Sequence, residues 1–211
     1  MQIIPTILEK QFDLAEEKIR LIKDQTTWIQ IDVIDSVYVH GKTFELERLT
    51  RSGLNTENIL WEVHLMVKEP QKWIAKSNFI DASRIIGQVE MMSDLEAFVS
   101  KVKDTAEAGL AFDIETPIGE IPKETDLVLL MARKAGFDPQ ELDSRIFDKI
   151  ETLKKIRKEE GLEFKIGVDG GITQENIKKL AEAGIDIAYC GGAIFNGNVK
   201  NNLEKLNERI K

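Results

Sequence analysis

The chain has almost no cysteine, no long hydrophobic run and no excess of positive charge. Cys190 is the single cysteine among 211 residues, which excludes an intramolecular disulfide and fits a reducing compartment. No apolar run reaches the roughly 20 residues that a transmembrane helix needs. The segment Met1–Pro5 lacks the basic and apolar regions of a secretory signal. We therefore expect a cytoplasmic protein.

The charge balance excludes two classes of partner. The formal net charge is −8, which argues against nucleic acid and against anionic membrane surfaces as partners. The same charge repels a phosphorylated ligand at long range, so any anion site must rely on local backbone dipoles and cations. The chain is 42 % apolar and 31 % charged, as expected for one globular domain spanning residues 1–211.

Eight apolar, β-rich runs alternate with longer charged segments of helical period along the chain. This alternation is typical of a parallel α/β protein whose sheet is covered on both faces. An open doubly wound sheet is an alternative, but eight units favour closure, so we predict a single (β/α)8 TIM barrel. Strands are expected at Gln2–Thr6, Thr27–Ile34, Trp61–Val67, Arg84–Glu90, Gly109–Ile114, Asp126–Ala132, Phe164–Val168 and Asp186–Cys190, with helices at Asp13–Lys23, Asp94–Glu107, Leu142–Glu160 and Asn201–Ile210.

Two of the expected strands end in glycine pairs. Gly170 and Gly171 follow Asp169, and Gly191 and Gly192 follow Cys190. Glycine permits a sharp turn and a close approach of backbone to ligand. Since the last two loops of a (β/α)8 barrel often bind phosphate, the glycine pairs predict a phosphate pocket at the C-terminal face of the barrel.

Three side chains at expected strand ends are candidates for chemistry: Asp32, His64 and Asp169. Side chains alternate along a strand, so Gln30 and Asp32 share one face, and in a barrel Asp32 then meets His64 of the next strand. Two carboxylates and an imidazole predict either a metal cluster or an acid/base pair acting on opposite faces of a substrate. The alternative is structural, with the aspartates capping loops and His64 a buried, hydrogen-bonded histidine.

Several motifs carry a resemblance that runs nearly from end to end. The sequence resembles the ribulose-phosphate 3-epimerase family, and Val63–Val67 and Val168–Ile172, in this order, are the most specific pair of elements. The residues that carry the resemblance are Ile4–Leu8, Ile31–Asp35, Val63–Val67, Thr116-Pro117, Gly136-Phe137, Val168–Ile172 and Gly191–Phe195.

The resemblance implies a (β/α)8 barrel of the ribulose-phosphate-binding type that moves a proton at C3 of a ketose phosphate. The expected reaction converts D-ribulose 5-phosphate to D-xylulose 5-phosphate, or acts on a related sugar phosphate. Asp32 and Asp169 would be the acid/base pair. These aspartates and His64 would also hold a divalent metal (Zn, Mn or Fe in the family), with Gln30 as a further candidate ligand. A homo-oligomer is expected, as is usual in the family. The substrate-binding residues implied are Thr6, Ile34, His64, Gly136, Gly170, Gly171, Gly191 and Gly192.

The sequence departs from the family pattern at the expected site. Gln30 replaces the family's first histidine ligand, and an amide oxygen is a weaker and harder donor than imidazole, which shifts the preference toward manganese, magnesium or no metal. In the loop after the sixth strand, Arg133 and Lys134 either supply cations to the site or only decorate the loop. Asp138 brings negative charge there, and Pro139 removes a backbone donor.

Two alternative functions are open, and the departures favour the first. One is a degenerate barrel that binds a phosphorylated ligand or a partner without catalysis. The other is a decarboxylase or aldolase of the orotidine-decarboxylase type, which needs a lysine between Asp32 and Asp35. The chain has Val33 and Ile34 there, so this alternative ranks last.

Overall fold

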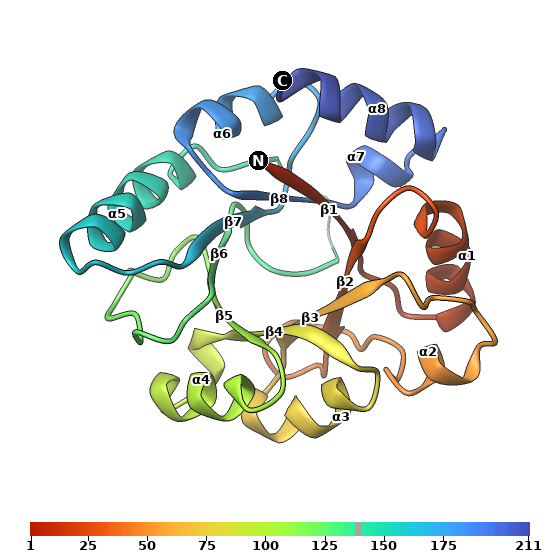
Figure 1. Ribbon diagram of the computed structural model, residues 1–211, viewed down its shortest axis with the longest axis horizontal. Coiled ribbons are helices and arrows are strands. Elements are labelled where there is room, and N and C mark those ends of the chain that lie inside the picture. The colour runs from red at the N-terminus through yellow and green to blue at the C-terminus, as the bar shows by residue number, and fades with distance from the viewer. Residues whose placement is uncertain (138–140) are drawn as a thin grey trace.

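The protein is described by a computed structural model that covers residues 1–137 and 141–211; Asp138 and Pro139 lie outside the described residues. Eight parallel strands form a closed barrel in the order of the sequence, and Figure 1 shows the helices as an outer ring around it. The predicted TIM barrel is therefore confirmed. The strands are β1 (Gln2–Ile7), β2 (Trp28–Ile34), β3 (Leu60–Met66), β4 (Ala82–Gln88), β5 (Glu107–Phe112), β6 (Leu127–Met131), β7 (Lys165–Asp169) and β8 (Ile187–Cys190).

The helical segments differ in length around the ring. The longest, α5, carries buried Ile146, Ile150 and Leu153 on one face, the spacing of an amphipathic helix packed on a sheet. The helices are α1 (Phe12–Ile22), α2 (Arg48–Arg51), α3 (Ile74–Asn78), α4 (Leu95–Lys103), α5 (Ile146–Glu159), α6 (Ile177–Ala183), α7 (Gly192–Phe195) and α8 (Val199–Arg209), with short 3₁₀ segments η1 (Pro70–Trp73) and η2 (Val89–Met91). No helix in the described ranges is long and apolar enough to span a membrane.

Each predicted strand overlaps an observed one, but three expectations for the helices were wrong. The helix expected to reach Glu107 ends at Lys103, because Glu107 pairs with Arg84 in the β4–β5 ladder and this pairing overrides its helical propensity. The helix expected from Leu142 begins at Ile146. The fifth unit has no helix at all, since residues 113–126 join β5 to β6 as turns and loop.

The barrel interior is built in layers of different polarity. Near the N-terminal ends of the strands, Arg84 lies between the carboxylates of Glu62 and Glu107, and Tyr189 donates a hydrogen bond of 3.1 Å to Glu62. Apolar side chains such as Ile4 fill the middle. The C-terminal ends of the strands carry the polar side chains that form the candidate site.

Candidate active site

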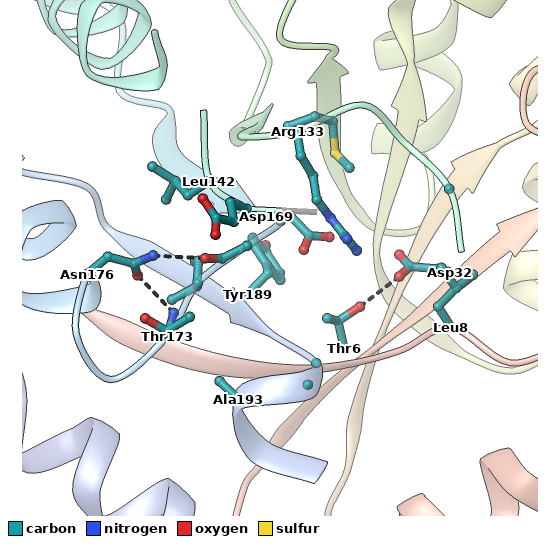
Figure 2. A pocket seen from close by; sticks show the side chains of 18 of the residues that line it. Thr6, Leu8, Asp32, Arg133, Leu142, Asp169, Thr173, Asn176, Tyr189 and Ala193 are labelled. Carbon is teal, nitrogen blue, oxygen red and sulfur yellow. Dashed lines mark hydrogen bonds between the residues drawn. The ribbon is translucent and has the colours of Figure 1, made fainter. Parts of the chain in front are cut away.

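The candidate site lies at the C-terminal face of the barrel, in a cavity of about 800 Å³. Such a position is where the loops of (β/α)8 barrels build active sites. Asp32 comes from β2 and Asp169 from β7, and both reach this cavity. Figure 2 shows the two carboxylates in the same mouth, with Thr6 below them. The predicted convergence of Asp32 and Asp169 is thus present in the structure.

Gln30 joins the two aspartates through one amide nitrogen. Its Nε2 donates to Asp32 Oδ1 at 2.9 Å, to Asp169 Oδ2 at 3.2 Å and to Thr6 Oγ1 at 3.0 Å. Thr6 in turn donates its hydroxyl proton to Asp32 Oδ2 at 2.8 Å. The strand register explains the cluster, because Thr6 of β1 is paired with Gln30 of β2. The uncharged side chain of Gln30 therefore bridges the carboxylates of Asp32 and Asp169 inside the barrel.

The ring of His64 is held in one orientation by hydrogen bonds on both nitrogens. Its Nδ1 lies 3.2 Å from Asp32 Oδ1, and its Nε2 lies 2.9 Å from Gln88 Oε1. Gln88 must present its oxygen to the ring, because its own Nε2 donates to the Glu90 carboxylate at 2.7 Å. Nε2 of His64 therefore carries a proton, and Nδ1 is the nitrogen directed at Asp32.

The electrostatics of the cluster favour the protonated forms of Asp169 and His64. Burial is the largest cause that raises the pKa of Asp169, to about 7, and the charge of Asp32 adds to it. Burial lowers the pKa of His64, but hydrogen bonding to Asp32 and the charges of Asp32 and Asp169 outweigh it, so the pKa of His64 is raised. A carboxyl group that titrates near neutral pH serves as an acid or as a base.

The same side chains fit a divalent metal. One ligand atom from each of Asp32, His64 and Asp169 lies within 4.8 Å of the others, which a single ion can span. Gln30 Oε1 is buried without a hydrogen-bond partner, and rotation of the amide by half a turn would direct it into the cluster as a fourth donor. Three oxygens and one imidazole nitrogen form a harder set than two imidazoles and two carboxylates would.

The other predicted site residues divide by whether they reach the cavity. Ile34 is only 1 % exposed and does not border the cavity, and His64 and Gln30 lie behind its wall rather than on it. The predicted residues that line the cavity besides the aspartates are Thr6, Gly136, Gly170, Gly171, Gly191 and Gly192.

The loop after β7 passes too close to its neighbour for any side chain. A Cβ on Gly171 would lie 2.4 Å from the backbone nitrogen of Leu142, and the φ of Gly171 is +66°. Asn176 holds the loop from the other side, since its Nδ2 donates to Gly171 O at 2.8 Å and its Oδ1 accepts from Thr173 N at 2.8 Å. Figure 2 shows the two contacts of Asn176 beside the cavity.

Sequence reasoning missed the residues that support the site from behind. Tyr38 donates its hydroxyl proton to Asp113 at 2.9 Å and lies 3.4 Å from Gln88 Nε2, so the loop after β2 supports the residue that orients His64. Glu90, which accepts the hydrogen bond from Gln88 Nε2, could have been found from the sequence because it lies two residues after Gln88. Tyr38 gave no such signal, because it sits in a loop far from β4 in sequence.

The closed barrel carries carboxylates, an imidazole and glycine-rich loops at its C-terminal face. These features place the protein in the class of (β/α)8 proteins that have a polar ligand cavity at the strand ends. The model of the "Ribulose-phosphate 3 epimerase family" matches residues 2–195. The chain belongs to this family, as its motifs predicted.

Named relatives agree with this membership. The ribulose-phosphate 3-epimerase of Treponema pallidum is 26 % identical over 208 residues, which cover 96 % of this chain and 95 % of that protein. The ribulose-phosphate 3-epimerase of Escherichia coli K12 is 29 % identical over 201 residues, which cover 92 % and 88 %. The solved structure of 3-hexulose-6-phosphate synthase from Salmonella typhimurium superposes with a TM-score of 0.70 over 100 % of this chain and 98 % of that one, at 13 % identity, and this likeness concerns the fold.

Proposed function

We propose that this protein is a ribulose-phosphate 3-epimerase, which inverts the configuration at C3 of a ketose phosphate by moving one proton. The observation that carries this proposal is the pair Asp32 and Asp169, on β2 and β7, which face one cavity and are bridged by Gln30. Inversion at a carbon needs a base on one face and an acid on the other. Family membership supports the same reaction.

The proton transfer needs one carboxylate and one carboxylic acid. The ionised aspartate takes the proton from C3, the C–H electron pair becomes the C2–C3 double bond, and the carbonyl pair moves onto O2. The protonated aspartate then gives its proton to the opposite face of C3, and the electrons return to the carbonyl. A pKa of about 7 at Asp169, raised first by burial and then by Asp32, allows that residue to start in either form at neutral pH.

The remaining groups bind and orient. The glycines after β7 and β8 line the cavity, and their backbone N–H groups would suit the phosphate of the substrate. The Thr6 hydroxyl suits a sugar hydroxyl beside Asp32. A divalent metal held by Asp32, His64, Asp169 and Gln30 would supply Lewis-acid stabilisation of O2, and the oxygen-rich donor set favours manganese or magnesium over zinc.

Solvent deuterium incorporation at C3 of D-ribulose 5-phosphate tests the proposal directly. We expect incorporation and formation of D-xylulose 5-phosphate with the wild type in the presence of Mn²⁺. Asp32→Asn and Asp169→Asn should each lower the rate by at least about 100-fold, the range expected for loss of an acid/base group. Lys134→Ala, which alters an exposed residue of the loop after β6, is the matched control and should keep the wild-type rate.

A barrel that only binds a phosphorylated ligand gives a different result. It would be stabilised against heat by sugar phosphates while showing no incorporation of deuterium under any metal condition. Wild-type activity in either asparagine variant would reject the two-carboxylate mechanism.

A further inference from the structure

Arg133 extends into the candidate active site from the first residues after β6. Its side chain crosses directly over Gly170, where an added Cβ would lie 2.5 Å from Arg133 Cγ and 3.2 Å from its Nε. Arg133 lines the same cavity as Asp32 and Asp169, and Figure 2 shows its guanidinium pointing between these two side chains. The neighbouring Lys134 is exposed and does not border the cavity.

The glycine beneath Arg133 makes this placement possible. Gly170 has a φ of +106° and no Cβ, so the aliphatic part of Arg133 lies against bare backbone and its charged end extends into the cavity between Asp32 and Asp169. Of the two cations that the sequence left open, the structure directs Arg133 and not Lys134 toward the site.

We propose that Arg133 is a further catalytic residue, whose guanidinium binds O2 of the ketose as that oxygen gains negative charge. This inference rests on the proposed epimerase reaction and assigns it a second source of positive charge. In the proton transfer described above, the carbonyl electron pair moves onto O2 while Arg133 donates N–H hydrogen bonds to it and keeps its own protons. A guanidinium stays charged at all working pH values and offers several donors in one plane.

Two consequences distinguish this role from simple packing. The first is that proton exchange at C3 continues when divalent metal is removed, because Arg133 still stabilises O2. The second is that Arg133 and a divalent cation compete for the negative charge of Asp32 and Asp169. Removing the guanidinium should therefore tighten metal binding while it slows the metal-free reaction.

The experiment compares wild type with Arg133→Met, Arg133→Lys and Lys134→Met. Deuterium exchange at C3 of D-ribulose 5-phosphate is measured with a chelator present. We expect the Arg133→Met variant to lose about 100-fold in rate, as for the loss of one oxyanion donor. We also expect Arg133→Lys to retain an intermediate rate, Lys134→Met to match wild type, and added guanidinium ion to restore part of the Arg133→Met rate.

Mn²⁺ binding, followed by calorimetric titration, gives a readout that does not depend on turnover. Arg133→Met should bind Mn²⁺ about tenfold more tightly than wild type, because one positive charge beside the carboxylates is gone, and Lys134→Met should not differ. The aliphatic chain of methionine still covers Gly170, so a thermal unfolding curve close to wild type is expected.

The inference fails separately from the proposed function. Wild-type exchange that stops on chelation but runs with Mn²⁺ would leave the epimerase intact and overturn the role of Arg133. An unchanged rate in Arg133→Met under chelation would do the same, and so would unchanged Mn²⁺ affinity. No exchange in wild type under any condition would overturn the epimerase and the catalytic role of Arg133 together.

Discussion

At the scale of single residues, Gln30 determines the character of the site. It is fully buried and directs its nitrogen at Asp32 and Asp169, so the two acids are held together by a neutral group. An imidazole in its place would add a strong metal ligand. The chain thus has two acids at one cavity with a neutral amide beside them, and Arg133 brings positive charge to the same cavity.

The buried acid predicts an unusual pH dependence of stability. Burial, followed by the charge of Asp32, raises the pKa of Asp169 from 3.8 to about 7 in the folded protein. The folded state then binds more protons than the unfolded state between these values. The contribution of Asp169 to the free energy of unfolding is therefore full below pH 3.8 and is lost as the pH rises through 7. With a chelator present, the melting temperature of wild type should fall relative to Asp169→Asn between pH 5 and pH 8.

Thermal unfolding of both proteins across that range measures the effect. The raised pKa of His64 acts in the same direction, and because the charge of Asp169 is one cause of that shift, the comparison with Asp169→Asn reports both effects of the aspartate together. If the melting temperatures of the two proteins change in parallel with pH, the pKa of Asp169 is at its ordinary value.

At the scale of elements, the loops that follow β6 and β7 depend on each other. Gly171 approaches the backbone of Glu141 and Leu142 so closely that no side chain fits between them. Asn176 holds the same loop from its other side through Gly171 O. The shape of the cavity wall is therefore set by contacts between two loops and not by either loop alone.

This dependence predicts different costs for two glycine substitutions. Gly171→Ala should destabilise the fold by about 3 kcal/mol, because it combines a left-handed backbone with a clash against backbone atoms. Gly161→Ala should cost only about 1 kcal/mol, since Gly161 has a similar φ of +62° but no atom within 4 Å of an added Cβ. Urea denaturation of both variants measures the difference, and equal costs would contradict the clash.

At the scale of the whole molecule, the barrel depends on buried charges beneath the candidate site. Arg84 forms ion pairs with Glu62 on β3 and Glu107 on β5, and its guanidinium lies 4.4 Å from the centre of the Trp28 ring on β2. Burial raises the pKa of Glu62 against the effect of Arg84. One buried arginine therefore connects four strands of the barrel.

Removing Arg84 alone should destabilise the fold much more than removing Arg84 together with the charge of Glu62. Arg84→Met leaves the Glu62 carboxylate buried without its cation and should cost about 3–5 kcal/mol. The double variant Arg84→Met/Glu62→Gln should recover more than half of that loss, because no uncompensated charge remains. Urea denaturation of the two single variants and the double variant gives the coupling energy. If the stability losses of the two single variants simply add in the double variant, the ion pair is not the cause of the destabilisation.

The sequence predicted the strands well and the helices less well. Apolar runs define the strands because each is buried on both faces, whereas Glu107 reads as the end of a helix until its pairing with Arg84 is known. The grouping of Asp32, His64 and Asp169 was predicted because they stand at strand ends. Tyr38 was not, because only folding brings the loop after β2 next to β4.

The sequence by itself determined the barrel, the family, and which side chains stand at the C-terminal ends of the strands, because periodicity and strand order are local properties of the chain. Only the tertiary structure decided that Gln30 presents its nitrogen to both aspartates, that Gln88 orients His64, and that Arg133 rather than Lys134 reaches the site. Those outcomes depend on register between strands and on packing over Gly170, which are contacts between residues far apart in sequence.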